Sequence, residues 1–477
     1  MIYKSIGNKM NDEKIREIFQ TQKKYKEEHF FISVKERKKK LKLLMNSVIS
    51  RTDEITKALN DDFGKAPAET KLTEIFPAVS EIREALRNVE RWTSPKRART
   101  PLSFWGTIGK VLYEPKGVVL IISPWNYPFL LAVGPLVSAI AAGNGAIVKP
   151  SEFTPNVLSV LEKIISEVFE PREVAVVSGD AETGEYLTSL PFDHIFFTGG
   201  TAIGKKVMKA AAENLTSVTL ELGGKSPVIL DESADIKDAA RKIAWGKLIN
   251  AGQTCIAPDY LLLPKNVENE FVSSFKNAVN EIFGGGETFE SNVDYCRLIH
   301  RKHFTRIKLL LDDALSQGAE TLFPVNFNEE RNFFSPNLIR NVNWKMKIMR
   351  EEIFGPLLPV IAYSDFDEIK KIVNKNRSPL SLYVFSKKKK FIDDILKEIP
   401  AGSTAVNGVV VQFANGNLPF GGRNGSGMGK AHGYYGFKTF SNEKSSLKQT
   451  SLSPLKYFYP PYTKTKEKLI DLLIKYF

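Results

Sequence analysis

The fold of this chain is decided by a stretch that reads GVVLIIS (117–123), FLLAVGPLVSAIAAG (129–143), GAIVKP (145–150) and NVLSVLEKIISEVF (156–169). The short runs are rich in β-branched residues, as buried strands are, and the longer runs have the length of helices. Apolar strands that alternate with helices of about 10 to 15 residues are typical of βαβ units, in which helices cover both faces of a parallel sheet. The stretch therefore predicts an α/β fold built on a parallel sheet.

The alternation continues toward the C-terminus. Further strand-like and helix-like runs are EVAVVSG (173–179), HIFFTGG (194–200), IGKKVMKAAAEN (203–214), VTLELGG (218–224), PVIL (227–230), YLLLP (260–264) and LYVFS (382–386). Upstream, residues 13–60 and 69–92 carry apolar residues at helical spacing among many charges. We therefore expect two α/β domains in series after a helical lead-in, which fits 477 residues at about 150 residues per domain.

The composition excludes several classes of protein. The chain has 43% hydrophobic and 25% charged residues and a net charge of +13, as a globular protein can have. Its lysine runs, 38–40 and 387–390, have no interleaved aromatic residues on which bases could stack, so we expect a solvated basic face and no nucleic-acid partner. The cysteines, Cys255 and Cys296, are too few for a disulfide scaffold or a CxxC-type zinc site. With an N-terminus that lacks a secretory signal, they predict a cytoplasmic protein.

Cys255 is a candidate nucleophile. It lies in NAGQTCIAP (250–258), among small and polar residues that indicate an accessible loop. A free thiol has a pKa of about 8.5, so it needs a helix N-terminus, a cation or a bound cofactor to favour the thiolate. Without such a partner Cys255 would be an inert buried residue, and Cys296 in NVDYCRLIH (292–300) has that interpretation.

Two polar residues follow predicted strands. Glu221 lies in TLELGGKSP (219–227), before two glycines that let a ligand approach the backbone. Partial burial would raise its pKa and make it a general base, whereas a salt bridge at the sheet rim is the alternative. Asn126, in SPWNYP (123–128), could offer its amide to an oxyanion or form a turn between two prolines.

The segment FFTGGTAIGKK (196–206) places glycines between a strand and a helix, where free N–H groups and the helix dipole favour a phosphate. Gly199, Gly204 and Lys205 nearly match the P-loop pattern. However, Lys206 stands where the hydroxyl that holds Mg²⁺ would be, and the GxGxxG pattern also fails. The segment is therefore either a phosphate site or a simple tight turn.

None of the five histidines has the partner pattern of a metal site. His300 and His303 are three residues apart on a predicted helix. The basic residues Arg301, Lys302 and Arg306 surround them and would repel a cation. We therefore interpret the two histidines as part of a basic surface and expect no metal.

Seven runs, taken in order, resemble the aldehyde dehydrogenase superfamily across essentially the whole chain. They are SPWNYP (123–128), VKPSE (148–152), FFTGGTAIG (196–204), VTLELGGKSP (218–227), GQTC (252–255), EEIFGP (351–356) and PFGG (419–422). Three further runs are similar to the class 3 branch, which includes fatty and aromatic aldehyde dehydrogenases: NAGQTCIAPDY (250–260), PFGGRNGSGMGKAHG (419–433) and YFYPPYTKTKEKL (457–469). The resemblance implies NAD or NADP as cofactor and a small-molecule aldehyde as substrate.

The resemblance also implies a catalytic role for three residues. Cys255 would attack the aldehyde carbonyl, and its backbone N–H together with the side-chain amide of Asn126 would hold the oxyanion. Glu221 would activate the water that hydrolyses the resulting thioester. Tyr127 and Phe420 would line an apolar substrate tunnel.

A cofactor site is implied in the same way. Its expected residues are Lys149, Glu152, Gly199, Gly200, Gly204, Glu352 and Phe354. Lys149 and Glu152 would meet the adenosine ribose, and the glycines would lie near the pyrophosphate. Glu352 would hold the nicotinamide ribose, with Phe354 beside it. Gly200 departs from the Ser or Asn more usual there and has no side chain to bond to phosphate.

The implied architecture is a Rossmann-like parallel-sheet cofactor domain, a second α/β catalytic domain and a small β arm that pairs two chains as a homodimer. The expected segments are 1–96 with 115–222 for the NAD(P)-binding domain, 223–436 for the catalytic domain, 97–114 with 437–462 for the arm, and 463–477 for an amphipathic helix. The implied reaction is oxidation of a medium- or long-chain aliphatic or aromatic aldehyde to its carboxylate.

Three alternatives are weaker. A CoA-acylating dehydrogenase would not need Glu221 to activate water. A phosphotransferase is disfavoured by Lys206, which lacks the required hydroxyl. A non-catalytic basic binding protein on the same fold would not need Cys255, Glu221 and Asn126 together.

The C-terminal segment predicts an amphipathic helix from Thr463, with Leu469, Leu472, Leu473 and Tyr476 on one apolar stripe. About fifteen residues are too few to span a bilayer. The helix could cover the substrate tunnel as a lid, lie on an anionic membrane as a peripheral contact, or pack on its own or a partner subunit. We expect the lid, because an apolar stripe near a tunnel mouth would serve long-chain substrates.

Overall fold

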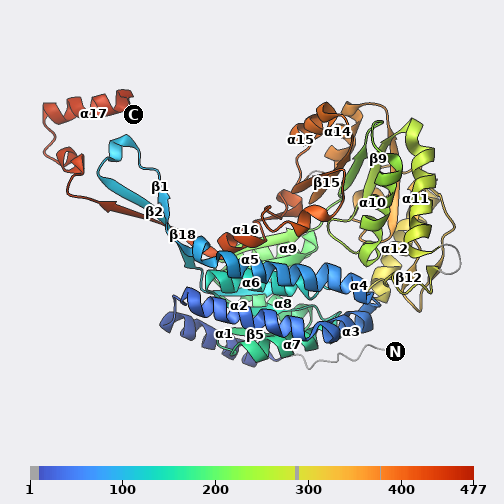
Figure 1. Cartoon of the computed structure of the whole chain (residues 1–477), viewed down its shortest axis with the longest axis horizontal. Helices are drawn as coiled ribbons and strands as arrows, with labels where there is room; N and C mark the ends of the chain where they lie inside the picture. The colour runs from blue at the N-terminus through green and yellow to red at the C-terminus, as the bar shows by residue number, and fades with distance from the viewer. Residues whose placement is uncertain (1–9, 285–288, 377, 477) are drawn as a thin grey trace.

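The computed structural model describes residues 10–284, 289–376 and 378–476. It comprises two α/β bodies and an arm that projects away from them (Figure 1). No helix within these ranges is both long and apolar enough to cross a membrane. Within the same ranges, no three His, Cys, Asp or Glu side chains gather as metal ligands would.

The first body is built on a six-stranded sheet in the order β17-β7-β6-β3-β4-β5. Its strands are β3 (Val118–Ile122), β4 (Gly145–Lys149), β5 (Val174–Val176), β6 (His194–Gly199), β7 (Ser217–Leu222) and β17 (Gly427–Met428). All neighbours are parallel except β17 and β7. The order places β3 in the interior with crossovers to both sides, as in a doubly wound α/β fold. The predicted parallel α/β sheet is confirmed.

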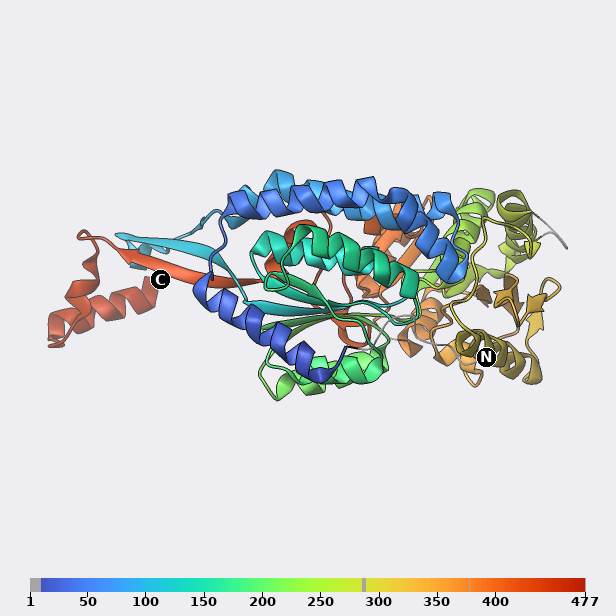
Figure 2. The same ribbon diagram turned by 90° about the horizontal axis from the view of Figure 1, so that it is seen from below.

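Helices cover both faces of this sheet (Figure 2). They are α1 (Asp12–Glu28), α2 (Val34–Ser50), α3 (Thr52–Phe63), α4 (Pro67–Thr70), the π-helical turn η1 (Lys71–Ile75), α5 (Phe76–Thr93), α6 (Leu130–Ala142), α7 (Pro155–Val168), α8 (Ala181–Ser189) and α9 (Thr201–Ala212). Val119 and Ile121 of β3 join the core on the side of α2 to α7, whereas Val118 and Leu120 join the core on the side of α1, α8 and α9. Because both faces are buried, the strand is apolar throughout.

The second body is built on a seven-stranded sheet in the order β10-β13-β14-β9-β8-β15-β16. Its strands are β8 (Pro227–Leu230), β9 (Tyr260–Pro264), β10 (Glu320–Thr321), β13 (Asn337–Arg340), β14 (Leu357–Tyr363), β15 (Ser381–Phe385) and β16 (Ser403–Val406), with a separate hairpin of β11 (Phe327–Asn328) and β12 (Phe333–Phe334). Only β10 pairs antiparallel in this sheet. The second α/β unit predicted from the sequence is therefore present.

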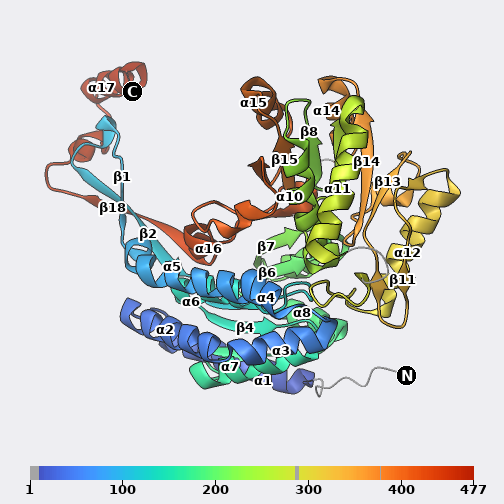
Figure 3. The ribbon, with the colours of Figure 1, turned by 45° about the vertical axis from the view of Figure 1, so that its right-hand side comes forward.

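The helices of the second body pack around this sheet, and α10 and α11 lie side by side (Figure 3). They are α10 (Ile236–Leu248), α11 (Glu268–Phe283), α12 (Arg301–Ser316), α13 (Lys347–Arg350), α14 (Phe366–Lys375) and α15 (Lys389–Glu398). Short 3-10 turns connect several elements: η3 (Ile249–Gly252), η4 (Lys265–Val267), η6 (Val411–Ala414) and η7 (Asn424–Ser426). The turn η3 is the one that leads into Cys255.

The chain returns to the first body after β16. The short strand β17 pairs with β7, with Gly427 opposite Glu221. The next helix, α16 (Gly433–Thr439), packs on α5 and α6. The expected boundary at residue 436 falls inside α16, so the structure attaches the segment from β17 onward to the first sheet.

The arm is a three-stranded antiparallel sheet in the order β1-β2-β18. It consists of β1 (Lys96–Ala98), β2 (Thr107–Pro115) and β18 (Ser441–Gln449), with the 3-10 turns η2 (Leu102–Phe104) and η8 (Pro454–Phe458) near its tip. The last helix, α17 (Lys464–Tyr476), lies beyond this tip and has no buried residue (Figure 1). The arm holds α17 away from both large sheets of its own chain, and its expected role as a lid on a substrate tunnel stays a prediction.

Candidate active site

One apolar cavity brings together four of the residues singled out in the sequence. It has a volume of about 290 Å³ and is lined by Tyr127, Glu221, Cys255 and Phe420, among others. Both bodies contribute to its wall, since Glu221 ends β7 of the first and Cys255 follows α10 of the second. Apolar residues, namely leucine, isoleucine, valine, alanine, proline, phenylalanine and tryptophan, make up most of the rest of the wall.

The loop that carries Cys255 is held rigidly. In η3, Asn250 and Ala251 have left-handed φ angles of 54° and 50°, which cost energy in non-glycine residues and indicate an enforced geometry. Gln253 is fully buried and fixes the loop through its whole amide, since Nε2 donates to the Asn250 and Arg297 carbonyls and Oε1 accepts from the Ile299 N–H. The position of the thiol is therefore set by the backbone around it.

Cys255 is partly buried, and this burial raises the pKa of its thiol, to which the nearby Glu352 and Glu221 carboxylates add. The thiol is therefore protonated in the unliganded protein, and an attack by sulfur requires an added positive charge or a base. Cys296 is buried against Asn250, 3.9 Å from its Oδ1, and does not line the cavity. We therefore keep the interpretation of Cys296 as an inert buried residue.

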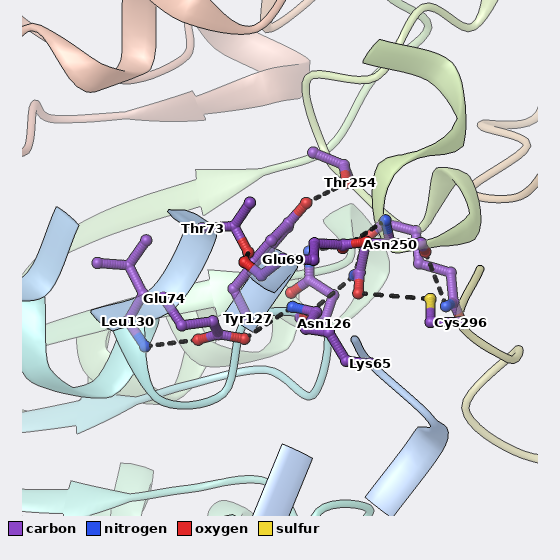
Figure 4. A network of polar contacts seen from close by, with 11 residues as sticks. Lys65, Glu69, Thr73, Glu74, Asn126, Tyr127, Leu130, Asn250, Thr254 and Cys296 are labelled. Carbon is purple, nitrogen blue, oxygen red and sulfur yellow. Dashed lines mark hydrogen bonds and ion pairs between the residues drawn. The ribbon is translucent and has the colours of Figure 1, made fainter. Parts of the chain in front are cut away.

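Asn126 and Tyr127 lie next to the Cys255 loop (Figure 4). Asn126 is buried, and its Nδ2 donates to the Gln253 carbonyl at 3.1 Å. The second hydrogen of this amide is not used by that bond. The Tyr127 hydroxyl lies 2.7 Å from Thr254 Oγ1. The structure thus brings an amide donor and an aromatic wall beside the nucleophile, as the sequence indicated.

Glu221 is a buried carboxylate without a hydrogen-bond partner on either oxygen among the described residues. Burial raises its pKa well above the ordinary range, and Lys430 partly offsets this effect. The Lys430 side chain packs close by and donates its own bonds to the Gly421 and Gly422 carbonyls. A carboxylate with free oxygens and a raised pKa, on the wall of the cavity that holds the thiol, is suited to act as a general base.

Five of the expected cofactor residues lie at or after the ends of β4 and β6: Lys149, Glu152, Gly199, Gly200 and Gly204. Lys149 Nζ is 3.2 Å from Glu152 Oε2, so the two form an ion pair after β4. Gly200 is the N-cap of α9, makes no side-chain cap, and faces open space, since an added Cβ would meet no atom within 4 Å. Gly204 brings α9 close to β7, because its Cβ would lie 2.6 Å from Leu222 Cδ2. An uncapped helix N-terminus with open space fits a pyrophosphate.

Glu352 reaches back to the first body. An alanine Cβ at Gly223 would overlap Glu352 Oε2, and the Gly224 N–H donates to the Glu352 carboxylate. Burial and the neighbouring Asp259 raise the pKa of Glu352 to about 8. The buried Lys225–Asp259 ion pair holds the loop behind it, since Lys225 donates to the Ile348 and Glu351 carbonyls and Asp259 accepts from Ile353. A carboxylate fixed at this interface fits a ribose diol.

The interpretation of His300 and His303 as a basic surface is wrong. His300 caps α12, and His303 is buried with Nε2 against the Phe354 carbonyl at 2.8 Å. Burial and Arg306 lower the pKa of His303 to about 3, so it is neutral. Its ring packs on Trp125 and Phe354, and it therefore supports the loop that carries Glu352.

The family follows from comparison with known proteins. The model of the aldehyde dehydrogenase family matches residues 6–446. The chain belongs to the aldehyde dehydrogenase family. The expected superfamily, the α/β fold and the dependence on NAD or NADP are confirmed, and the enzyme is an oxidoreductase that acts on an aldehyde.

Relatives and solved structures of the family align with nearly the whole chain. The 4,4'-diaponeurosporen-aldehyde dehydrogenase of Staphylococcus aureus is 41% identical over 92% of this chain and 94% of that protein. Aldehyde dehydrogenase family 3 member A2 of Mus musculus is 40% identical over 90% and 88%, in line with the class 3 resemblance. The substrate-bound structure of Staphylococcus aureus AldH has a TM-score of 0.92 at 39% identity and covers 96% of this chain and 99% of that one. The NADP complex of the glyceraldehyde-3-phosphate dehydrogenase of Bacillus halodurans has a TM-score of 0.84 at 26% identity, over 93% and 92%.

Sequence reasoning missed the polar residues behind the site. Lys65, Glu74 and Asn250 are buried, and together with the half-buried Glu69 they form a network that contacts the Asn126 loop (Figure 4). The sequence holds one local indication of these residues, since charged residues in KAPAETKLTEI (65–75) interrupt an otherwise amphipathic helical pattern. Helical spacing alone assigns such charges to the solvent face.

Proposed function

We propose that Cys255, Asn126 and Glu221 carry the oxidation of a medium- or long-chain aliphatic or aromatic aldehyde to its carboxylate. The observation that supports this most is Glu221, a buried carboxylate on the wall of the cavity that also holds Cys255, with no hydrogen-bond partner on either oxygen in the described part of the chain. Such a group is costly to bury and calls for a functional reason. A water molecule at this point would be its hydrogen-bond partner and the attacking group of the second half-reaction.

In the acylation half, Cys255 Sγ gives its proton to solvent and bonds to the aldehyde carbon, so the carbonyl electron pair moves to oxygen. The Asn126 amide and the Cys255 backbone N–H stabilise this oxyanion, and one such donor is worth about 10²–10³ in rate. When the carbonyl forms again, the hydrogen on carbon leaves as hydride, which the nicotinamide cofactor accepts when bound. A thioester then remains on Cys255.

In the deacylation half, Glu221 takes a proton from water while the water oxygen bonds to the thioester carbon. The carbon–sulfur bond breaks, the carboxylic acid leaves, and Cys255 regains its thiol. Because burial raises the pKa of Glu221, its ionised carboxylate accepts a proton more readily than an ordinary carboxylate does. This step distinguishes the proposal from a CoA-acylating dehydrogenase, in which a thiol and not water takes the acyl group.

The apolar cavity supports an apolar aldehyde. Among the side chains that line it, Phe76, Trp245, Phe413 and Phe420 are large and apolar, and such walls favour hydrocarbon by removing its surface from water. The relative from Staphylococcus aureus is named for an aldehyde of diaponeurosporene. Rates for octanal, hexadecanal and benzaldehyde, each with NAD and with NADP, would test both the substrate class and the cofactor.

The nucleophile is tested by replacing the two cysteines separately. Cys255→Ala should abolish NADH or NADPH formation, because no thioester can form. Cys296→Ala should leave the rate within about twofold of the wild type, since this buried thiol does not line the cavity. Substantial turnover by the Cys255→Ala enzyme would refute the mechanism and favour a non-catalytic role for the fold.

We also propose a cytoplasmic homodimer paired through the arm. β18 is an edge strand of the arm's sheet, and its outer side pairs with no other strand among the described residues. This free edge and a set of exposed apolar side chains near the tip support pairing with a second copy. These side chains are Leu102, Phe104, Trp105, Ile108, Leu447, Leu452, Tyr457, Tyr459 and Tyr462. Two free cysteines are what a reducing compartment such as the cytoplasm allows.

A peripheral membrane contact is a further proposal for α17. Leu469, Leu472, Ile474 and Tyr476 are exposed on it, beside several lysines that would favour an anionic surface. Co-sedimentation with phosphatidylserine vesicles, for the full chain and for a chain ending at residue 462, tests this contact. Equal sedimentation of the two would refute it.

A further inference from the structure

A buried ion pair lies directly behind the loop that carries Asn126. Lys65 Nζ is 2.9 Å from Glu74 Oε1, and both side chains are completely buried. Lys65 precedes α4, and Glu74 lies in the π-helical turn η1. Neither residue lines the cavity, so the pair can influence the reaction only through the groups that it contacts.

The Lys65–Glu74 pair forms hydrogen bonds with both ends of the turn from Asn126 to Leu130. Lys65 Nζ donates to the Asn126 carbonyl at 3.4 Å, and Glu74 Oε2 accepts from the Leu130 N–H at 2.9 Å. Lys65 Nζ also lies 4.1 Å from the centre of the Tyr127 ring. The cation thus holds the first two residues of the turn, and the carboxylate holds its last residue at the start of α6 (Figure 4).

A second set of bonds ties this turn to the Cys255 loop. Asn250 Nδ2 donates to the Asn126 carbonyl at 2.9 Å and to the Gln253 carbonyl at 3.0 Å. The Asn250 N–H in turn donates to Glu69 Oε1 at 2.8 Å. The Asn126 carbonyl therefore receives two donors, from Lys65 and Asn250, while its side-chain amide reaches the Cys255 loop at Gln253.

We propose that Lys65 and Glu74 are positioning residues for acylation, which fix the Asn126 amide and the Tyr127 ring relative to Cys255. The inference rests on the proposed role of Asn126 as an oxyanion donor. A buried ion pair contributes little net stability compared with apolar residues of the same size, so stability alone does not explain its presence. A misplacement of about 1 Å at a reacting group can cost roughly 100-fold in rate.

The test is a double-mutant cycle between the pair and Asn126. The variant Lys65→Met/Glu74→Leu removes both charges together, so neither member of the pair is left buried without the other. It is compared with Asn126→Ala and with the triple variant, and the measured quantity is the rate of NADH formation in the first turnover with octanal and NAD, or with NADP if NAD gives no turnover. First-turnover rates report acylation and not thioester hydrolysis or product release.

We expect the pair variant to lose about 10- to 100-fold in this rate, and Asn126→Ala to lose roughly 10²–10³. The triple variant should match Asn126→Ala within about threefold, because the pair acts through Asn126. The matched control is Lys40→Met/Glu173→Leu. There Lys40 also bonds a carboxylate and a backbone carbonyl, that of Val168, but does so far from the cavity. This control should change the rate less than about twofold.

Two other results would refute the inference, and one of them would also refute the oxyanion role of Asn126. If the losses of the pair variant and Asn126→Ala multiply in the triple variant, the pair acts on general structure and the inference fails, while the oxyanion role stands. If Asn126→Ala is as fast as the wild type, the proposed oxyanion role fails and the inference fails with it. Should the pair variant not fold, Lys65→Met/Glu74→Gln replaces it in the same cycle, since it also removes both charges and keeps an acceptor for the Leu130 N–H.

Discussion

Glu352 makes the stability of the unliganded enzyme depend on pH. Its pKa is raised from 4.5 to about 8, chiefly by burial, so the folded protein binds this proton more tightly than the unfolded chain. The resulting stabilisation is fully present below pH 4.5 and is lost as the pH rises through 8, at no more than about 1.4 kcal/mol per pH unit.

Glu352→Gln, which resembles the protonated acid, should therefore gain in melting temperature relative to the wild type as the pH rises from 5 to 8.5. The measurement is thermal unfolding of both proteins without cofactor across this range. A difference in melting temperature that stays constant with pH would show that Glu352 keeps its ordinary pKa.

Single residues also show how far the sequence could predict the site. Glu221 and Asn126 could be singled out because each follows or ends a predicted strand, and Cys255 because it lies in a loop of small and polar residues. The resemblance to the aldehyde dehydrogenase superfamily supplied their roles. The structure places Cys255 and Glu221 on one cavity and Asn126 beside the Cys255 loop. His303 could not be predicted correctly, because its basic sequence neighbours give no sign that its ring turns inward to Phe354. Lys65 was missed for the same reason, since spacing does not reveal a buried cation.

The loop between β7 and β8 depends on glycine at one position. A side chain at Gly223 would overlap the Glu352 carboxylate, so Gly223→Ala should displace Glu352 and weaken its bond to a ribose. We expect the KM for NAD or NADP to rise about tenfold or more, because the loss of a hydrogen bond to a charged group weakens binding by about that factor.

Gly425→Ala is the matched control, because its added Cβ would meet no atom within 4 Å. Steady-state kinetics with varied cofactor and saturating aldehyde measure both variants. An unchanged cofactor KM in Gly223→Ala would indicate that Glu352 does not hold the cofactor.

Among the elements, the strands that form buried apolar runs could be predicted from the sequence, whereas a two-residue strand could not. The alternation of strands and helices was legible because β3, β4 and β6 are buried on both faces. The strand β17 has only two residues, which carry no periodic signal. Its pairing with β7, which brings the chain back to Glu221, depends on a contact between residues some 200 positions apart in the sequence.

The whole molecule has an arm whose exposed apolar side chains predict a dimer. Leu447 on β18 is 58% exposed, and an aspartate there would bring a charge into any contact that buries it. Leu447→Asp should therefore shift the protein from dimer toward monomer in size-exclusion chromatography with light scattering. Leu215→Asp, at a position 94% exposed on the first body, should not. A wild-type monomer, or an unchanged dimer in Leu447→Asp, would contradict pairing through this part of the arm.

The placement of α17 shows what the sequence cannot give at this scale. The helix itself was predictable from its stripe of leucines, and α17 spans Lys464–Tyr476. The position of α17 could not be predicted, because the direction of the arm depends on the pairing of β2 with β18. These two strands are more than 300 residues apart in the sequence. The sequence therefore predicts the helix but not the surface that it contacts.

The central claim is that an acyl group passes through Cys255 and leaves by way of Glu221. The most direct measurement is mass spectrometry of Glu221→Gln after mixing with octanal and the cofactor, followed by digestion. We expect one burst of reduced cofactor per active site, slow steady-state turnover, and an octanoyl mass on the peptide that contains Cys255. A burst and steady state that fall together, with no acyl group on Cys255, would contradict it.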